Sequence, residues 1–318
     1  MKISRTSMLL MAGAAASMLV LSACSESSTD ADSASSSDTV SVETANGPVE
    51  IPANPVRVAA LDNTSFETLQ AFGIEPVALP KPLMPDEGFE EWISNDAILD
   101  VGTHREPNLE VVSEAEPDLI IGGYRFQEYT DELSQIAPTI DISPTDENYV
   151  ESLKAQTEKL GTIFGKEDQA ADIIAALDAA EADAAAQTTG QTVFLANVNG
   201  GKIDNGAQRI GRLLEPLNLR DVFAGEAGDV HGDSGLAPET IAQANPDWVI
   251  VLDRDAAAGE EGASPAGAVF AAQEAFANTT FTTQDQIIYL DPYFYTREGI
   301  QAYTEAFEGI STAFANAA

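Results

Sequence analysis

Two stretches of the chain match each other: residues 110–125, EVVSEAEPDLIIGGYR, and residues 239–254, ETIAQANPDWVIVLDR. Each begins with Glu, continues after six residues with Pro-Asp and ends after six more with Arg, so the landmarks are offset by 129 positions. A short amphipathic segment precedes Pro-Asp and an apolar run follows it, a pattern typical of a helix, a turn and a buried parallel strand. The strands end near Arg125 and Arg254, at the edge where open α/β sheets bind ligands. We therefore expect two copies of one unit, each presenting a cation to a common cleft.

The rest of the chain continues this alternation of apolar strands and amphipathic helices, which is typical of α/β lobes. A small β-hairpin is expected over residues 40–51, and the strand pattern restarts at residues 192–197. Between the two copies, residues 166–187 contain no proline and keep a helical period. At the usual rise such a helix would be about 33 Å long. It is long enough to connect two lobes, although an ordinary surface helix would show the same pattern.

The N-terminus has the pattern of a bacterial lipoprotein signal. Lys2 and Arg5 precede an apolar stretch at residues 8–20, and Leu-Ser-Ala at 21–23 leads to Cys24, the only cysteine. We therefore expect residues 1–23 to be a signal peptide and Cys24 to carry the lipid. Residues 24–39 are mainly Ser, Asp, Ala and Thr and predict a disordered tether. These features predict an extracytoplasmic protein held on a membrane by its anchor.

The formal charge is −37, from 52 acidic and 15 basic residues, which argues against binding of nucleic acid. Because cations are few, their positions are informative. Four of them follow predicted strands: Lys81, Arg125, Arg209 and Arg254. The guanidinium fork suits carboxylates, phosphates and the deprotonated oxygens of a chelate. The alternative is that each of the four pairs with one of the many nearby acids.

Imidazole and phenol groups also occur in predicted loops of the second half. His231 lies in the segment DVHGD at residues 229–233, and Tyr293 and Tyr295 follow the last predicted strand in DPYFYT at residues 291–296. Imidazole nitrogen and phenolate oxygen together suit a ferric ion. They could equally be a polar loop residue and an aromatic patch. No glycine-rich phosphate loop, HExxH, GxSxG or cysteine pair is present, so the familiar enzyme motifs are absent.

Several segments in order, among them FLANVNGGKIDNGAQRIGRLLE, VHGDSGLAPETIAQANPDWVIVLDRDAA and IIYLDPYFYT, resemble siderophore-binding lipoproteins of iron ABC importers. The similarity is greatest to the branch that carries ferric catecholates, including tetradentate ones. It implies a class III periplasmic binding protein, an α/β fold with two Rossmann-like lobes joined by a single long hinge helix. We expect an N-terminal lobe at residues 40–165, the hinge helix at 166–188 and a C-terminal lobe at 189–318.

The resemblance also implies roles for single residues. Arg125, Arg209 and Arg254 match the arginine triad that faces the anionic chelate. His231 and Tyr295 match the histidine and tyrosine that complete the coordination of iron. The tyrosine loop is one residue shorter than in the family, so Tyr293 is kept as the reserve.

Glutamates on top of each lobe dock the permease in this family, and Glu110 and Glu239 match them. A local capping role in the first turn of a helix is the alternative for both glutamates. The resemblance further implies a monomeric, non-enzymatic receptor with Fe(III) only as part of its ligand and no intrinsic cofactor. A haem-binding receptor of the same fold is the first rival, and an extracellular enzyme or adhesion module is the more remote one.

Overall fold

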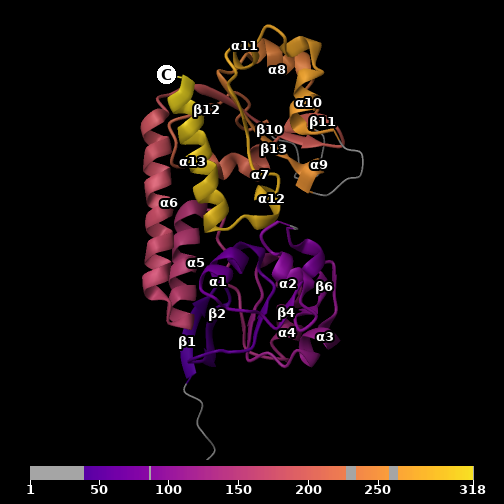
Figure 1. The fold of residues 1–318 in the computed structure, drawn as a ribbon, viewed down its shortest axis with the longest axis vertical. Coiled ribbons are helices and arrows are strands. Elements are labelled where there is room, and N and C mark those ends of the chain that lie inside the picture. The colour runs from indigo at the N-terminus through magenta and orange to yellow at the C-terminus, as the bar shows by residue number, and fades with distance from the viewer. Residues whose placement is uncertain (1–38, 86, 227–233, 258–263, 318) are drawn as a thin grey trace, which may run out of the picture. The chain divides into compact units, whose positions relative to one another are not determined.

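Two mainly parallel β-sheets, one from each half of the chain, form the centres of two lobes (Figure 1). The structure is a computed structural model that describes residues 39–85, 87–226, 234–257 and 264–317. All of these residues belong to one compact unit. The expected signal peptide and Cys24 lie outside the described residues, as does the expected tether up to residue 38. None of the described helices is long and apolar enough to span a bilayer.

The first sheet has five parallel strands in the order β5-β4-β3-β8-β9. They are β3 (Val58–Ala60), β4 (Ala78–Leu79), β5 (Leu99–Asp100), β8 (Leu119–Ile121) and β9 (Thr139–Ile140). Its helices are η1 (Asn63–Ser65), α1 (Phe66–Ala71), η2 (Lys81–Leu83), α2 (Glu90–Ser94), α3 (Leu109–Glu114), η3 (Tyr124–Tyr129) and α4 (Thr130–Leu133). Two antiparallel hairpins join this lobe, β1 (Thr39–Thr44) with β2 (Gly47–Pro52), and β6 (Gly102–Thr103) with β7 (Glu106–Pro107). The first hairpin confirms the prediction for residues 40–51.

The second sheet follows the order β11-β10-β13-β14, and β12 also pairs with β10. Its strands are β10 (Thr192–Asn199), β11 (Lys202–Asn205), β12 (Arg220–Asp221), β13 (Trp248–Asp253) and β14 (Ile287–Tyr289). Only β11 is antiparallel to its neighbour. The helices of this half are α7 (Ala207–Ile210), η4 (Gly211–Leu214), α8 (Pro238–Ala244), α9 (Arg254–Ala257), α10 (Ala266–Ala271), η5 (Glu274–Phe276), α11 (Thr280–Thr283), α12 (Phe294–Arg297) and α13 (Ile300–Ala317).

Two long helices, α5 (Tyr149–Phe164) and α6 (Glu167–Gln187), connect the sheets and run beside α13 (Figure 1). Gly165, with φ 62°, ends α5 in the left-handed conformation that glycine adopts readily. The start of α6 packs on the first core through Ala170, and its later turns pack on the second through Leu177 and Ala184. One helix thus belongs to both cores, which is the packing that a hinge helix requires. The expected lobe boundaries stay a prediction.

The matched stretches fold alike. In each, a helix (α3 or α8) leads through Pro-Asp into a central strand (β8 or β13). The residue before the proline has a left-handed backbone in both copies, Glu116 with φ 45° and Asn245 with φ 44°. The aspartates also act alike: Asp118 accepts from the backbone N–H groups of Val56 and Arg57, and Asp247 accepts from the N–H and hydroxyl of Thr192. Each carboxylate therefore fixes the entry of the neighbouring parallel strand, which fixes the sheet register at both sites.

Candidate functional site

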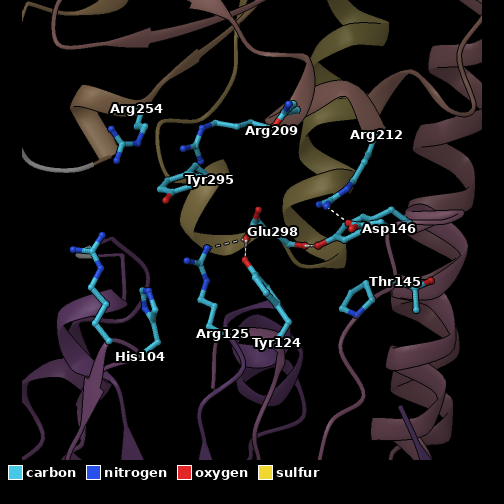
Figure 2. A pocket seen from close by; sticks show the side chains of 14 residues that line it. His104, Tyr124, Arg125, Thr145, Asp146, Arg209, Arg212, Arg254, Tyr295 and Glu298 are labelled. Atoms are coloured by element: carbon cyan, nitrogen blue, oxygen red, sulfur yellow. Dashed lines mark hydrogen bonds and ion pairs between the residues drawn. The ribbon is translucent and has the colours of Figure 1, made fainter. Parts of the chain in front are cut away.

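A cavity of about 620 Å³ lies between the two sheets, at the carboxyl ends of their parallel strands (Figure 2). Its walls come from both halves of the chain, with η3 and the β6–β7 hairpin on one side and α7, α9 and α12 on the other. Five arginines line it: Arg105, Arg125, Arg209, Arg212 and Arg254. Lining carboxylates are fewer, with Asp146 and Glu298 only. The structure thus gathers the three predicted arginines at one cavity, and in a chain of charge −37 this is a local concentration of positive charge.

Arg125 is brought to the cavity by the two glycines that follow β8. Gly123 has φ 67°, and a side chain there would place its Cβ 2.6 Å from the Cβ of Asp62, so the close approach requires glycine. The chain then turns into η3, and the Nε of Arg125 donates to Oδ1 of Asn63 at 2.9 Å. Its terminal nitrogen donates to Glu298 at 3.0 Å, and both side chains are mostly buried. Arg125 is therefore held from two sides.

Arg254 follows β13 directly and begins α9. Its guanidinium donates to the side-chain oxygen of Asn199, the last residue of the neighbouring strand β10. This repeats the arrangement of Arg125, since Asn63 follows β3, the strand that neighbours β8. Among the described residues Arg254 has no ion pair with a carboxylate. The two arginines thus differ in their charge environment although their supports match.

Tyr295 lies at the centre of the arginine cluster (Figure 2). The guanidinium carbon of Arg209 is 4.6 Å from the centre of its ring, and those of Arg125 and Arg254 are each 5.8 Å away. Burial raises the pKa of the phenol, but the three positive charges and a hydrogen bond from Arg209 outweigh it, so the pKa falls below its ordinary value. A phenolate at this position is easier to form than on an ordinary tyrosine, which favours coordination of a Lewis-acidic metal.

Among the lining residues that were not singled out from the sequence as site residues, three have basic side chains. Arg105 and His104 form the turn of the β6–β7 hairpin, and Arg212 lies on η4 with its guanidinium 4.2 Å from the ring centre of Tyr149 and paired with Asp146. None of them follows a strand of the two main sheets directly, so the rule that placed Arg125 and Arg254 does not find them. The signal available for Arg105 and Arg212 was their residue type, because only 15 residues of this acidic chain are Lys or Arg.

His104 is the histidine that the structure places at this cavity. Within the described part of the chain its Nδ1 is buried and has no hydrogen-bond partner. Partial burial and the charges of Arg125 and Arg105 lower the pKa of the imidazole, so its neutral form is favoured. A neutral imidazole with an available nitrogen is a possible donor to a metal.

The other predicted residues have different positions. Lys81 does not line this cavity: its ammonium donates to the carbonyls of Ile93 and Asn95 at the end of α2, both at 2.9 Å. These carbonyls hold the charge away from the cleft. Tyr293 lines a smaller adjoining cavity of about 380 Å³, which shares Arg125 and Tyr295 with the first. His231 lies outside the described residues.

Glu110 and Glu239 lie in the first turns of α3 and α8, one in each copy of the repeat, and both are exposed. Neither makes a capping bond in the described structure. Asn108 caps α3 by accepting from the N–H of Val111, and α8 begins with Pro238 and has no side-chain cap. Both positions fit the local alternative, a favourable interaction of the carboxylate with the helix dipole, but neither glutamate adds a capping hydrogen bond.

A two-lobed α/β fold with a long connecting helix and a polar cavity between the lobes defines a bilobal ligand-binding protein. The sequence pattern of the periplasmic binding protein family matches residues 58–294, and the chain belongs to that family. Its members are substrate-binding proteins and not enzymes. The predicted class of fold is thereby confirmed.

Similar proteins include the petrobactin-binding protein YclQ of Bacillus subtilis, 30% identical over 298 residues, which cover 90% of this chain and 92% of that protein. The ferric-anguibactin-binding protein FatB of Vibrio anguillarum is 30% identical over 219 residues, 66% of this chain and 67% of its own. Among solved structures, the periplasmic catecholate-siderophore-binding protein VctP of Vibrio cholerae aligns with a TM-score of 0.77 at 27% identity, covering 86% of this chain and 100% of that one.

Proposed function

We propose that this protein captures a ferric siderophore of the catecholate type in the cavity between its lobes and delivers it to an ABC permease. The cluster of arginines around Tyr295 is the observation that carries the proposal. Catecholate oxygens bound to iron keep negative charge, and arginine forks donate to such oxygens without being deprotonated. The names of the related proteins support a siderophore ligand: YclQ is a petrobactin-binding protein, FatB a ferric-anguibactin-binding protein and VctP a catecholate-siderophore-binding protein.

In this proposal Tyr295 binds the iron as a phenolate. It fills a coordination site that a tetradentate siderophore leaves open. Its lowered pKa and central position support this role. His231 is the histidine that family resemblance assigns as the second ligand, and His104 is a second candidate because its imidazole lines the cavity. Iron belongs to the ligand in this proposal, and the protein needs no resident cofactor.

Direct titration tests the ligand class. Full-length protein in detergent is equilibrated with ferric bis-catecholate, ferric tris-catecholate, ferric hydroxamate or haemin, and bound iron is counted after equilibrium dialysis. Binding of the catecholates above the hydroxamate supports the proposal. Tight binding of haemin with a Soret shift, and none of the catecholates, would instead establish the haem-binding rival.

Substitution of Tyr295, His231 and His104 tests the coordination step. Tyr295→Phe is expected to weaken the bis-catecholate complex more than the tris-catecholate complex, because only the former leaves iron sites open. The same comparison for His231→Ala and His104→Ala identifies the histidine that coordinates. Equal losses for both complexes in all three variants would exclude direct coordination by the protein.

The proposed function also includes a lipid anchor and two residues that contact the permease. Cys24 is the proposed lipid attachment site, which would keep the receptor on the outer side of the membrane beside its permease. Glu110 and Glu239 are the proposed docking residues, and their exposure in the two copies of the repeat supports this assignment. The double substitution Glu110→Ala/Glu239→Ala should abolish uptake of labelled ferric siderophore by cells while leaving its binding to the purified receptor unchanged.

A further inference from the structure

Glu298 places a negative charge inside the arginine cluster. It follows α12 in a left-handed conformation, with φ 52°, and its side chain lines the cavity. One of its oxygens, Oε2, accepts from the hydroxyl of Tyr124 at 2.8 Å, from Arg125 at 3.0 Å and from the amide of Asn63 at 3.3 Å. The carboxylate is thus anchored by three donors, all from the other half of the chain.

The second oxygen of Glu298 has no hydrogen-bond donor among the described residues. All hydrogen bonds to the carboxylate within the described residues are made by Oε2, and Oε1 accepts none. In Figure 2 this second oxygen points away from Tyr124 and Arg125. A carboxylate oxygen carries lone pairs for further donors, so a ligand in the cavity that offers an N–H or O–H group can be bound there.

The negative charge of Glu298 is not needed to hold the two lobes together. The neighbouring Arg297 already pairs across the lobes with Glu67 of α1, and the amide of Asn63 donates to the carbonyl of Thr296 at 3.0 Å. Gly299 also approaches the other half so closely that a Cβ would lie 2.7 Å from the carbonyl oxygen of Thr64. The junction is therefore held beside Glu298 by other contacts, and the charge of Glu298 acts mainly on Arg125 and on the cavity.

Glu298 also adds a negative charge beside one of the lining arginines. Of the five lining arginines, Arg212 is paired with Asp146 and Arg125 with Glu298. An anionic ligand that approaches Arg125 meets the like charge of Glu298, which is poorly screened because both side chains are mostly buried. A ligand with a positive or donor group next to its anionic chelate avoids this repulsion and gains a bond.

We propose that Glu298 is a specificity-determining residue that contacts the ligand and selects ferric chelates carrying an ammonium or other donor group beside the anionic iron centre. This inference rests on the proposed function of siderophore binding. It deepens that function by defining a class of substrate: a chelate with a cationic or donor-bearing backbone is preferred over a chelate that is anionic throughout.

Two matched probes test the proposal. Both are ferric complexes of linear bis-catechols with linkers of equal length, one a plain alkyl chain and the other containing one secondary amine, which is protonated at neutral pH. Dissociation constants are measured by equilibrium dialysis for the full-length protein, for Glu298→Gln and for the control Glu308→Gln. Glu308 is exposed on α13 and does not line the cavity, so its substitution removes one charge without touching the site.

The wild-type protein and Glu308→Gln should prefer the amine probe by about tenfold, the value of one hydrogen bond to a charged group. Glu298→Gln should reduce this preference to about twofold or less and bind the alkyl probe more tightly, because the repulsion is gone. A preference that is absent in the wild type or unchanged in Glu298→Gln would overturn the proposal. Equal weakening of both probes together with a lower melting temperature would also overturn it, because Glu298 would then act only as a latch. Failure of the wild type to bind either probe would refute the proposed function itself, and this inference with it.

Discussion

The two copies of the repeat share their scaffold and differ at their ends. Asp118 and Asp247 fix the neighbouring strand in the same way, and an asparagine supports the arginine in both halves. Arg125 has in addition a carboxylate partner, Glu298, whereas Arg254 has none among the described residues. The repeated sequence therefore positions two cations, and residues outside the repeat decide how much charge each one offers a ligand.

Removal of Arg125 should have the largest effect. Arg125→Ala leaves Glu298 in a mostly buried position without its ion-pair partner, so we expect a loss of about 2 kcal/mol in the free energy of unfolding. Binding of a ferric catecholate should weaken by about a hundredfold, since a cation is lost and a like charge is exposed to the ligand. Arg254→Ala should weaken binding without a comparable loss of stability. Urea unfolding and equilibrium dialysis of both variants measure the contrast.

A double variant separates the two consequences for Arg125. In Arg125→Ala/Glu298→Ala the unpaired carboxylate is absent, so much of the lost stability should return while binding stays weak. If the double variant is as unstable as Arg125→Ala, the pair does not account for the difference between the two copies.

A buried acid lies next to Asn63, the residue that supports Arg125. Asp62 precedes Asn63, is fully buried, and accepts from Thr64 and Gln156. Burial raises the pKa of Asp62 from 3.8 to about 6. The folded state then binds this proton more tightly than the unfolded state, so the contribution of Asp62 to stability is full below pH 4 and is lost as the pH rises through about 6.

Asp62→Asn should remove this dependence, because the amide does not ionise. The variant is expected to be more stable than the wild type at pH 8 by about 1–3 kcal/mol and to lose this advantage near pH 4. Urea midpoints of the two proteins across this range give the difference curve, in which the other acidic groups cancel. A constant difference at every pH would show that Asp62 does not titrate in this window.

The equivalence of the scaffolds themselves can be tested at the Pro-Asp pairs. Asp118→Ala and Asp247→Ala each remove a carboxylate that accepts two hydrogen bonds at the start of a strand. Each should lower the free energy of unfolding by about 1–3 kcal/mol, and by similar amounts. A large loss for only one of them would mean that the repeat is structural in one lobe alone.

The repeat in the sequence predicted one part of the site, the two arginines that end its copies. The equal spacing of Pro-Asp and arginine predicted both central strands, and the strand ends predicted Arg125 and Arg254 at one cavity. Arg105 and Arg212 were missed because they lie on a hairpin turn and a 3₁₀ helix, where position relative to the sheet is not encoded by a period. Lys81 was expected at the cavity from its place after a strand, but the carbonyls at the end of α2 bind its ammonium elsewhere.

Glu298 was beyond reach for a different reason. Its partners are far away in the sequence, at positions 63, 124 and 125, and they meet it only when the two halves pack together. In a chain with 52 acidic residues, one more glutamate gives no signal. The position of Glu298 therefore depends on how the two halves of the chain pack together. The positions of the arginines at strand ends depend only on the local sequence pattern.

The smallest expected effect concerns the left-handed residue that precedes the proline in each copy of the repeat. Glu116 has φ 45°, a conformation that costs little only for glycine and asparagine, so Glu116→Gly should raise the free energy of unfolding by about 0.5–1 kcal/mol. Asn245 has nearly the same backbone, but its amide donates to the hydroxyl of Thr280 at 2.8 Å and its oxygen accepts from the N–H of Thr280 at 2.8 Å. Asn245→Gly should therefore lower stability by about 1 kcal/mol, because two hydrogen bonds are lost and asparagine already tolerates this backbone. Opposite signs in thermal unfolding would show that the two copies share a backbone but stabilise it by different means, and equal gains would show that the Thr280 bonds contribute nothing.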